Sequence, residues 1–173
     1  MHRVYVGQNS FEQIGTGGGR FAGGRVVQIE GVDDLTLDGN SGIGALNGFL
    51  FVGGQNQRLT LQNNVIGLSE TRFGGWGQSF VSAEGVGLGS AALAHHAPNA
   101  VVRRNVMWGF NPNNFPADNL FPTDPSEVGF AGFLTNLELT GSSPFLTSST
   151  SGGMVGVNFA NLRQRLAGVI VNP

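Results

Sequence analysis

The sequence predicts an all-β solenoid, a parallel β-helix of about four coils with a C-terminal cap and a short terminal helix. Two observations predict it. A short alternating strand followed by asparagine recurs along the chain, and before residue 158 period-two alternation is frequent while helical periodicity is almost absent. Composition agrees, since 29 of the 173 residues are glycine and only 12% are charged. Such a chain suits many tight turns and an uncharged polar surface.

The repeat is clearest around four asparagines. "VYVGQNSFEQIG", "LTLDGNSGIG", "LTLQNNVIG" and "AVVRRNVMWG" place Asn9, Asn40, Asn64 and Asn105 after matching alternating strands. The spacings are 31, 24 and 41 residues. We expect these four residues to stack about 4.8 Å apart at a corner, where asparagine tolerates left-handed backbone angles and its amides can form a ladder. The alternative is an ordinary β-turn in a β-sandwich, with solvated asparagines.

The remaining elements complete one domain over residues 1–173. The apolar runs 25–31 and 48–54 supply a further strand of each coil, whereas 90–96 fits that role less well. The other predicted segments are a glycine-rich loop insertion at 68–89, a surface connection at 109–133, and the last strand and cap at 134–173. Within the cap, residues 158–169 have helical apolar spacing, and Asn158 is placed to cap that helix.

Composition also excludes several classes. A net charge of −2 offers no basic field for nucleic acid, and the absence of cysteine removes disulfides, Cys-ligated zinc and thiol nucleophiles. No stretch approaches the roughly 20 apolar residues that cross a bilayer. The first residues read as the middle of a repeat without an export signal, so we expect the chain to begin inside a longer protein. Its first strand, near Val4–Val6, is then an open edge through which the chain would self-associate.

The repeat and the segment 113–162, "NNFPADN…NFANL", resemble right-handed parallel β-helix proteins of the pectate-lyase-like superfamily. The C-terminal portion resembles the closing segment of large secreted bacterial β-helix proteins of uncharacterised function, with a turn at Ser143-Pro144 and a glycine-rich segment before a short helix. Ser151 and Asn158 stand where those proteins usually carry acidic residues. The resemblance implies a right-handed helix, a secreted or cell-surface location and a link to polysaccharides.

Enzymes of this superfamily that cleave acidic polysaccharides use outward carboxylates for calcium and an Arg or Lys base, so the outward columns are informative. One predicted column, Arg3–Asp34–Arg58–Asn99, alternates in charge sign, which is typical of a solvated face whose charges pair. The strand that lines the substrate groove in such enzymes carries Gln28 and Glu30 in one coil, but Leu50 and Val52 in the next. That is a poor match to a lyase site.

No cofactor is predicted, with calcium as the alternative. Among the acidic residues Glu30, Asp33, Asp34 and Asp38, the last two are about 13 Å apart along a strand and cannot share an ion. Only Glu30 with Asp33 or Asp34 could do so, across the turn at Gly31.

Two further groups invite a functional reading. His95 and His96 on an extended segment would face opposite ways, so a backbone hydrogen bond at a corner is favoured over a metal site. Glu84 has no acidic partner at a fixed spacing for glycosidase chemistry.

The ligand candidates lie in the predicted loop. Trp76, with Arg72 and Phe73, would place an indole plane beside a polar groove, where it could stack on a sugar ring. The alternative is that Trp76 folds back over the side of a coil. Trp108 is interpreted as a packing residue.

Three functions stay open, and the sequence leaves the enzymatic status undecided. The first is a non-catalytic or vestigial part of a secreted β-helix protein that recognises a polysaccharide. The second is a fragment of a polysaccharide lyase or glycoside hydrolase, with its active site in missing coils. The third is a structural or adhesive solenoid.

Overall fold

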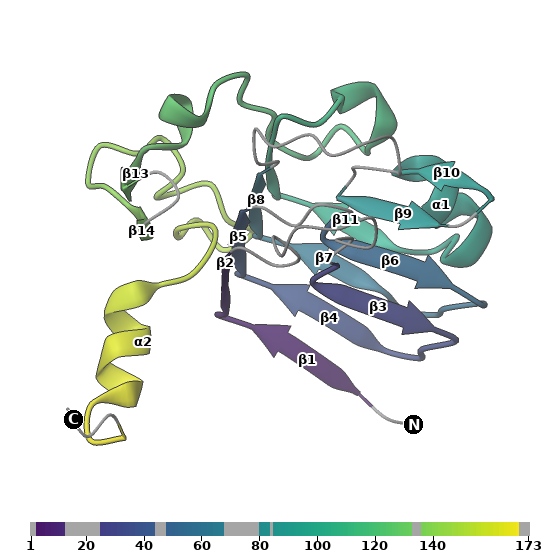
Figure 1. The fold of residues 1–173 in the computed structure, drawn as a ribbon, viewed down its shortest axis with the longest axis horizontal. Coiled ribbons are helices and arrows are strands. Elements are labelled where there is room, and N and C mark those ends of the chain that lie inside the picture. Colours follow the sequence, from purple (N-terminus) through teal and green to yellow (C-terminus); the bar gives the residue numbers. More distant parts are fainter. Residues whose placement is uncertain are drawn as a thin grey trace, which may run out of the picture.

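The chain is mainly β. The computed structural model describes residues 3–12, 25–43, 48–67, 80–83, 85–132 and 136–169, and most of its regular elements are short strands in parallel sheets, with two α-helices (Figure 1). The prediction of a β chain built mostly from parallel strands is therefore confirmed in the coarser form of a mainly-β fold. Neither helix in the described ranges has the length and apolar character needed to span a bilayer.

Three sheets form the body of the molecule, which we call the stack (Figure 1). The first has the order β1-β4-β7-β11, from Val4–Gly7, Leu35–Asp38, Thr60–Gln62 and Val101–Arg103. The second has the order β2-β5-β8-β12, from Ser10–Glu12, Ser41–Ile43, Val65–Gly67 and Val106–Trp108. The third has the order β3-β6-β9-β10, from Val27–Glu30, Leu50–Gly53, Val81–Ala83 and Gly87–Leu88, with only β10 antiparallel.

The chain visits the three sheets in a repeating order, and the parallel registers follow the sequence repeat. Val4 pairs with Leu35, and Leu37 pairs with Leu61, which pairs with Val102. The inward positions of this sheet are therefore occupied by equivalent apolar residues from successive passes of the chain. Burial of one face accounts for the alternation of buried and half-buried residues in β4.

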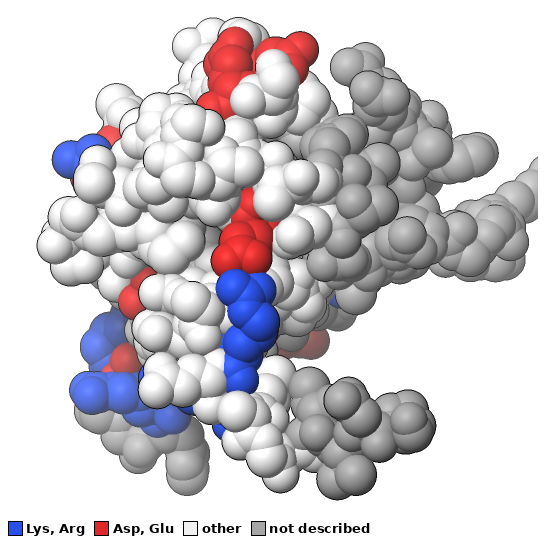
Figure 2. Space-filling model, turned by 90° about the vertical axis from the view of Figure 1, so that its left-hand side faces the viewer, with Lys and Arg blue, Asp and Glu red and all other residues white. Residues whose placement is uncertain are grey.

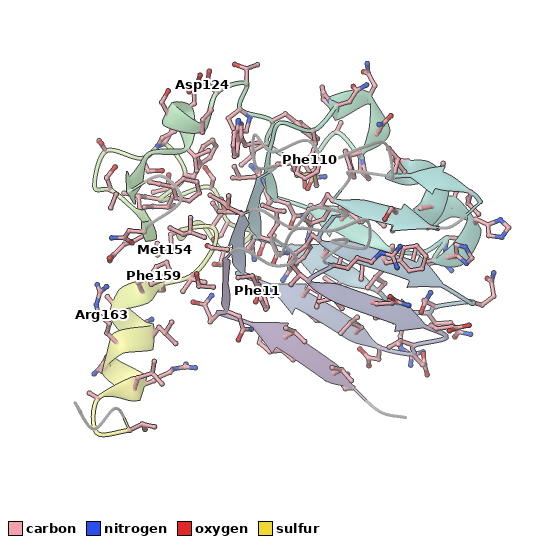
Figure 3. All side chains as sticks on the ribbon, in the orientation of Figure 1. Phe11, Phe110, Asp124, Met154, Phe159 and Arg163 are labelled. Atoms are coloured by element: carbon pink, nitrogen blue, oxygen red, sulfur yellow. The ribbon has the colours of Figure 1, made fainter. Side chains whose placement is uncertain are left out.

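Aromatic rings fill the interior between the sheets. The rings of Phe49 and Phe80 are fully buried and stack with centroids 5.2 Å apart. Phe11 meets Phe49 edge to face on one side, and Phe110 and Phe115 meet Phe80 edge to face on the other. In Figure 3, Phe11 projects from β2 and Phe110 lies above it, toward the far end of the stack. This arrangement gives the sheets a continuous apolar core.

An asparagine ladder runs along one corner of the stack, as the repeat predicts. The Nδ2 atoms of Asn9, Asn40 and Asn64 donate to the Oδ1 atoms of Asn40, Asn64 and Asn105 at 3.0, 2.9 and 2.8 Å. The backbone N–H of each donor residue bonds the same Oδ1 atom, and each Nδ2 also donates to a backbone carbonyl. The ladder asparagines from Asn40 onward are buried without an unpaired amide hydrogen.

The left-handed residue at this corner precedes the ladder asparagine. Positive φ angles occur at Gln8, Gly39, Asn63 and Arg104, each one residue before a rung. The expectation that the ladder asparagine itself takes the left-handed angle is therefore wrong. The two tasks are divided: in the pair Asn63-Asn64, the first residue turns the chain and the second forms the rung. The β-turn of a sandwich with solvated asparagines does not describe this corner.

The interpretation of residues 68–97 needs correction. Ser90–His96 is a helix, α1, and not a strand-like segment. The strand that follows β6 in the third sheet is β9, inside the range 68–89 that the sequence predicts to be a projecting loop. Phe80, expected in that loop, is fully buried in the core. The alternation before β9 is interrupted by glycines, which is why the strand was hidden in the sequence.

Residues 109–122 cover the end of the stack beyond β11 and β12, rather than crossing only the surface. Phe110 and Phe115 are buried against the core, on either side of a 3₁₀ turn, η1, at Pro112–Asn114. Asn119 adds a fifth rung, because its Oδ1 accepts both the side-chain Nδ2 and the backbone N–H of Asn105. Leu120 then pairs in parallel with Val106. This segment thus makes the ladder and backbone hydrogen bonds of a further strand, although it is not a regular strand.

The last predicted strand lies outside the stack. β14, at Asn136–Leu139, pairs antiparallel with β13, at Phe130–Gly132, in a separate two-stranded sheet. A second 3₁₀ turn, η2, at Pro125–Val128 precedes β13. Val128 and Leu139 pack with Val106 and Trp108 in a second apolar cluster. Trp108 is thus a packing residue, and a Cβ atom added at Gly67 would lie 2.2 Å from its ring.

The C-terminal segment returns along the β2-β5-β8-β12 sheet. The backbone N–H groups of Gly156, Val157 and Asn158 donate to Asn63 O, Ser41 Oγ and Gln8 Oε1. Helix α2, Phe159–Leu166, begins after Asn158, whose Oδ1 accepts the N–H of Asn161 as predicted. None of its side chains is buried, so α2 does not cap an end of the stack; residues 109–122 do so instead.

Candidate functional site

The outer face of the β1-β4-β7-β11 sheet is charged but internally paired. Arg3 Nε lies 3.2 Å from Asp34 Oδ2, and Arg58 lies 2.6 Å from Asp33 and 3.8 Å from Asp34. The predicted alternating column therefore forms ion pairs between neighbouring strands. Exposed pairs of this kind contribute little to stability, and the pairing leaves these carboxylates less available to a ligand.

A second outward column on this sheet is held by amides. Gln62 Nε2 donates to Asp38 Oδ2 at 3.2 Å, and Arg103 donates to Gln62 Oε1. Asn63 Nδ2 donates to the other oxygen of Asp38 at 2.7 Å. Asp34 and Asp38, which the sequence places too far apart to share an ion, are thus each bound by protein donors.

No metal site is assembled in the part of the chain that the structure describes. Across these residues, no group of three or more His, Asp or Glu side chains is placed to hold an ion. Glu30 is exposed at the end of β3, while Asp33 faces Arg58. The arrangement does not support the calcium alternative, and Glu84 falls outside the described residues.

The two histidines lie on a helix and not on an extended segment. His95 and His96 end α1, and their rings meet at 76° with centroids 4.6 Å apart. His96 Nδ1 is 2.6 Å from the carbonyl oxygen of Gly54. The predicted hydrogen bond from a histidine to the backbone is therefore present at His96, where it ties α1 to the turn after β6.

The β3-β6-β9 sheet presents a different outer face. Its register aligns Gln28 with Phe51 and Phe51 with Ser82, while Leu50 and Val52 are buried. The expectation that Leu50 and Val52 stand on the outward column beside Gln28 and Glu30 is therefore wrong by one residue. The reason is that both alternating sets of "FLFV" are apolar, so the pattern does not indicate which set faces the core.

Phe51 carries a cation on its ring. The guanidinium carbon of Arg25 lies 3.7 Å from the centroid of the Phe51 ring, and Arg25 Nη1 donates to Gln28 Oε1 at 3.2 Å. Among the described residues, no carboxylate lies within ion-pair distance of Arg25, in contrast to Arg3 and Arg58. We call Arg25, Gln28 and Phe51 the Arg25–Phe51 platform. It combines a half-buried apolar ring with a planar cation and an amide that are both exposed.

The residues that the sequence predicts to bind a ligand are different from those of this platform. Arg72, Phe73 and Trp76 lie outside the described residues. By connectivity they belong to the segment between Gly67, at the end of β8, and Phe80, which precedes β9.

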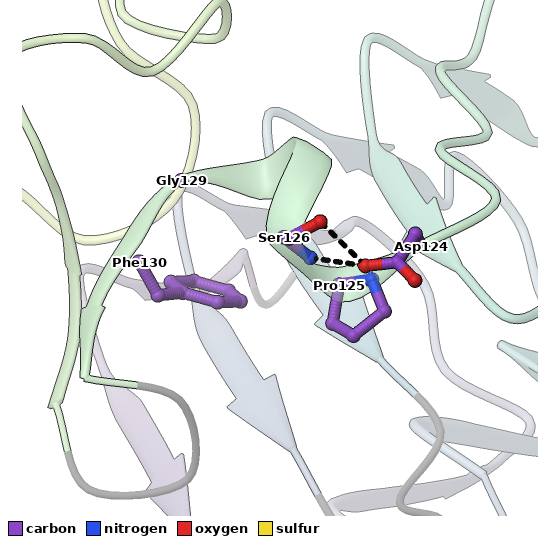
Figure 4. Close-up of a pocket in the computed structure, with 5 residues that line it drawn as sticks. All are labelled: Asp124, Pro125, Ser126, Gly129 and Phe130. Carbon is purple, nitrogen blue, oxygen red and sulfur yellow. Dashed lines mark hydrogen bonds between the residues drawn. The ribbon is translucent and has the colours of Figure 1, made fainter.

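A small cavity lies elsewhere, between η2 and β13. It has a volume of about 390 Å³ and is lined by Asp124, Pro125, Ser126, Gly129 and Phe130 (Figure 4). Asp124 Oδ1 accepts hydrogen bonds from Ser126 N–H and Oγ, and these bonds lower the pKa of Asp124. The carboxylate thus caps the 3₁₀ turn that follows it, a common role of aspartate at such positions. This role accounts for its hydrogen bonds, so the cavity gives no indication of a ligand.

Charge is sparse over the molecule as a whole. Figure 2 shows one face that is mostly uncharged, on which the few acidic and basic groups partly lie against one another, as in the stripe near its centre. The sequence carries nine Lys and Arg against eleven Asp and Glu. A ligand would therefore be recognised through hydrogen bonds and aromatic contact rather than through a broad field.

In comparisons with known proteins, no family model, curated protein or solved structure matches the chain.

Proposed function

We propose that the chain is a segment of a right-handed parallel β-helix, with each pass through the three sheets forming one coil. The repeating order of the sheets, the in-register parallel pairs and the asparagine ladder support this proposal. Short strands that stack in this way bury a continuous core only through their neighbours, which is the defining property of solenoids. The family resemblance of the sequence adds the handedness.

We further propose that this segment recognises a polysaccharide without cleaving it, at the outer face of the β3-β6-β9 sheet. One observation carries the proposal: in the Arg25–Phe51 platform, an exposed guanidinium lies on a half-buried aromatic ring, and no carboxylate of the described residues neutralises it. Sugars present apolar C–H faces and a rim of hydroxyl groups. An aromatic ring bordered by guanidinium and amide donors is complementary to both.

The geometry gives the platform a direction along the stack. Gln28 and Phe51 belong to neighbouring strands, which lie about 4.8 Å apart, whereas Ser82 at the same position of the third strand is buried. A chain of sugar rings could therefore follow the row from one strand to the next. The N–H groups of Arg25 that do not bond Gln28 would meet hydroxyl or carboxylate oxygens.

The residues on this face support recognition rather than hydrolysis. Glycoside hydrolysis requires two carboxylates flanking the bond. Among the described outward residues of β3, β6 and β9, only Glu30 carries one. A secreted or cell-surface location, which the resemblance implies, would bring the platform into contact with polysaccharide. Trp76, with Arg72 and Phe73, is proposed as a second contact from the segment before β9.

The test is binding to a panel of neutral and acidic polysaccharides, measured by affinity electrophoresis and titration calorimetry. Phe51→Leu keeps an apolar side chain but removes the ring, and Arg25→Gln removes the cation. We expect each to weaken binding at least about tenfold, which corresponds to roughly 1.4 kcal/mol. Tyr5→Ala removes an exposed aromatic from another sheet and should leave binding unchanged.

The outcomes separate the alternatives. Binding that survives both platform variants but is lost in Trp76→Ala would move the site to the segment before β9. Release of unsaturated sugars or reducing ends during incubation would favour the enzyme fragment instead. If no polysaccharide in the panel binds the folded chain, the proposal fails and the structural or adhesive solenoid stands.

A further inference from the structure

The outer edge of β1 is unpaired in the structure. β1 pairs with β4 on one side, and no strand of the described residues pairs with it on the other. Val4 and Tyr5 are 43% and 60% exposed, unlike their equivalents Leu35 and Thr36 within the sheet. An open strand edge is a template for another strand.

The backbone of β1 directs hydrogen-bonding groups toward this edge. Val4 N–H donates to Asp34 O, and Gln8 N–H donates to Asp38 O. Alternate residues of a parallel strand bond the same neighbour, so Tyr5 and Gly7 present their N–H and C=O groups on the opposite side. That side needs the donors and acceptors of a further strand.

The asparagine ladder adds a side-chain requirement. In four successive rungs, one Oδ1 atom accepts both the backbone N–H and the Nδ2–H of the asparagine before it. Asn9 donates in this way to Asn40, but no donor from the described residues reaches Asn9 Oδ1. The ladder therefore ends in an acceptor that matches one specific partner, an asparagine at the same register.

Two other features point to the same side. The column Arg58–Asp34–Arg3 alternates in sign and ends at Arg3, so an acidic residue would continue it. Helix α2 starts beside Gln8 and extends beyond β1 and β2 in Figure 1. It buries no side chain, and Leu166 is exposed on its apolar stripe. An added strand and the chain that follows it would lie next to this uncovered helix.

We infer that the β1 edge is a docking site for an extended polypeptide strand, added parallel to β1. Its required sequence is two apolar residues at alternate positions with asparagine three residues after the second, as in Leu35, Leu37 and Asn40. The asparagine would donate its backbone N–H and Nδ2–H to Asn9 Oδ1. An acidic residue preceding the first apolar position would meet Arg3.

A second copy of this chain does not meet the requirement. The far end of the ladder, at Asn119, is covered by residues 109–122, so it offers no free strand for head-to-tail stacking. Two β1 edges that face each other across a two-fold axis would run antiparallel, and neither would place an asparagine donor at the other's Asn9 Oδ1. The partner is therefore a strand of the stated sequence type.

The test uses fluorescence anisotropy with a labelled peptide of residues 33–43, "DDLTLDGNSGI", added to the full 173-residue chain. We expect saturable binding that weakens at least tenfold when the peptide carries Asn40→Leu, which keeps size but removes the donors. On the protein, Tyr5→Pro removes an outward N–H that β4 does not use, and should abolish binding. Tyr5→Thr keeps that N–H and should preserve it.

Several results would overturn the inference. Equal binding of the two peptides would show that the ladder does not select the partner. Binding that survives Tyr5→Pro, in a variant with unchanged circular dichroism, would place the peptide elsewhere. Absence of binding to the folded chain, or a dimer that forms through β1 and excludes the peptide, would also overturn it. None of these results bears on polysaccharide binding at the Arg25–Phe51 platform.

Discussion

The two ends of the stack use the same chemistry to different extents. At the β11–β12 end, Asn119 completes the ladder, and Phe110 and Phe115 cover the core. At the β1 end, Asn9 leaves its Oδ1 without a described donor, and Val4 and Tyr5 are exposed. Closing a stack therefore does not require a regular strand. It requires one asparagine at the correct position and enough apolar surface to cover the last layer.

The largest expected difference between the ends is in aromatic packing. Phe115→Ala at the closed end should lower the free energy of unfolding by about 3–5 kcal/mol, because it opens a cavity beside Phe80 and Phe110. Tyr5→Ala at the open end should change it by less than about 0.5 kcal/mol. Chemical denaturation of both variants measures the contrast. An equal decrease in the free energy of unfolding for the two variants would mean that the β1 end is covered in solution.

The loss of a rung in the middle of the stack measures how much one buried ladder asparagine contributes to stability. Asn64→Ala should destabilise by about 1–3 kcal/mol, because Asn40 loses its acceptor and the carbonyl of Leu37 loses its donor, both in buried surroundings. The same denaturation experiment measures the loss. A change near zero would mean that water replaces the amide at this corner.

Comparison of the terminal rungs sharpens the contrast further. Asn119→Ala should cost about 1–3 kcal/mol, since it removes the shared acceptor of Asn105 from a buried site. Asn9→Ala should cost about 0.5–1.5 kcal/mol, because Asn9 is half-buried and only donates to the ladder. If Asn9→Ala proves the more costly, the β1 end is the better packed of the two.

The smallest effect concerns the anchoring of α2 near the open end. Arg163 donates to both oxygens of Glu138 at 2.8 and 2.9 Å, and these bonds lower the pKa of Glu138. A carboxyl group whose pKa is lowered in the folded state stabilises that state at pH values above its ordinary pKa. This stabilisation is lost as the pH falls through the pKa of the folded state. The NMR shifts of residues 159–166 should move as pH is lowered from 7 to 3.

Glu138→Gln is the control for this titration. It keeps the length of the side chain but removes the charge, so α2 should show its low-pH shifts already at pH 7. High salt should reduce the difference from the wild type, because Arg163 is exposed and Glu138 is only half-buried. A titration identical in the wild type and the variant would contradict a role for this pair.

Several features were readable from the sequence because they repeat. The spacing of Asn9, Asn40, Asn64 and Asn105 identified the rungs, and the alternation around them identified the inward and outward columns of the first sheet. The cap at Asn158 followed from an ordinary helix-start signal. Local patterns of this kind survive folding because each is enforced by the same burial and hydrogen-bonding demand in every pass of the chain.

Other features gave no such signal. Asn119 follows Asn105 by 14 residues within a proline-rich segment, so its spacing matches no repeat. Both faces of "FLFV" are apolar, so the outward position of Phe51 was missed, and with it the Arg25–Phe51 platform. Phe80 was assigned to a loop because the glycines before it hide the strand that follows.

The sequence by itself determined that this chain is built from short parallel strands with an asparagine at one corner, since backbone alternation and amide chemistry act within a few residues. Only the tertiary structure decided which segments close the stack and which leave it open. That choice depends on contacts between residues far apart in sequence, such as Asn105 with Asn119 and Gln8 with Asn158. Local patterns do not encode such contacts, because their energy appears only when the layers are assembled.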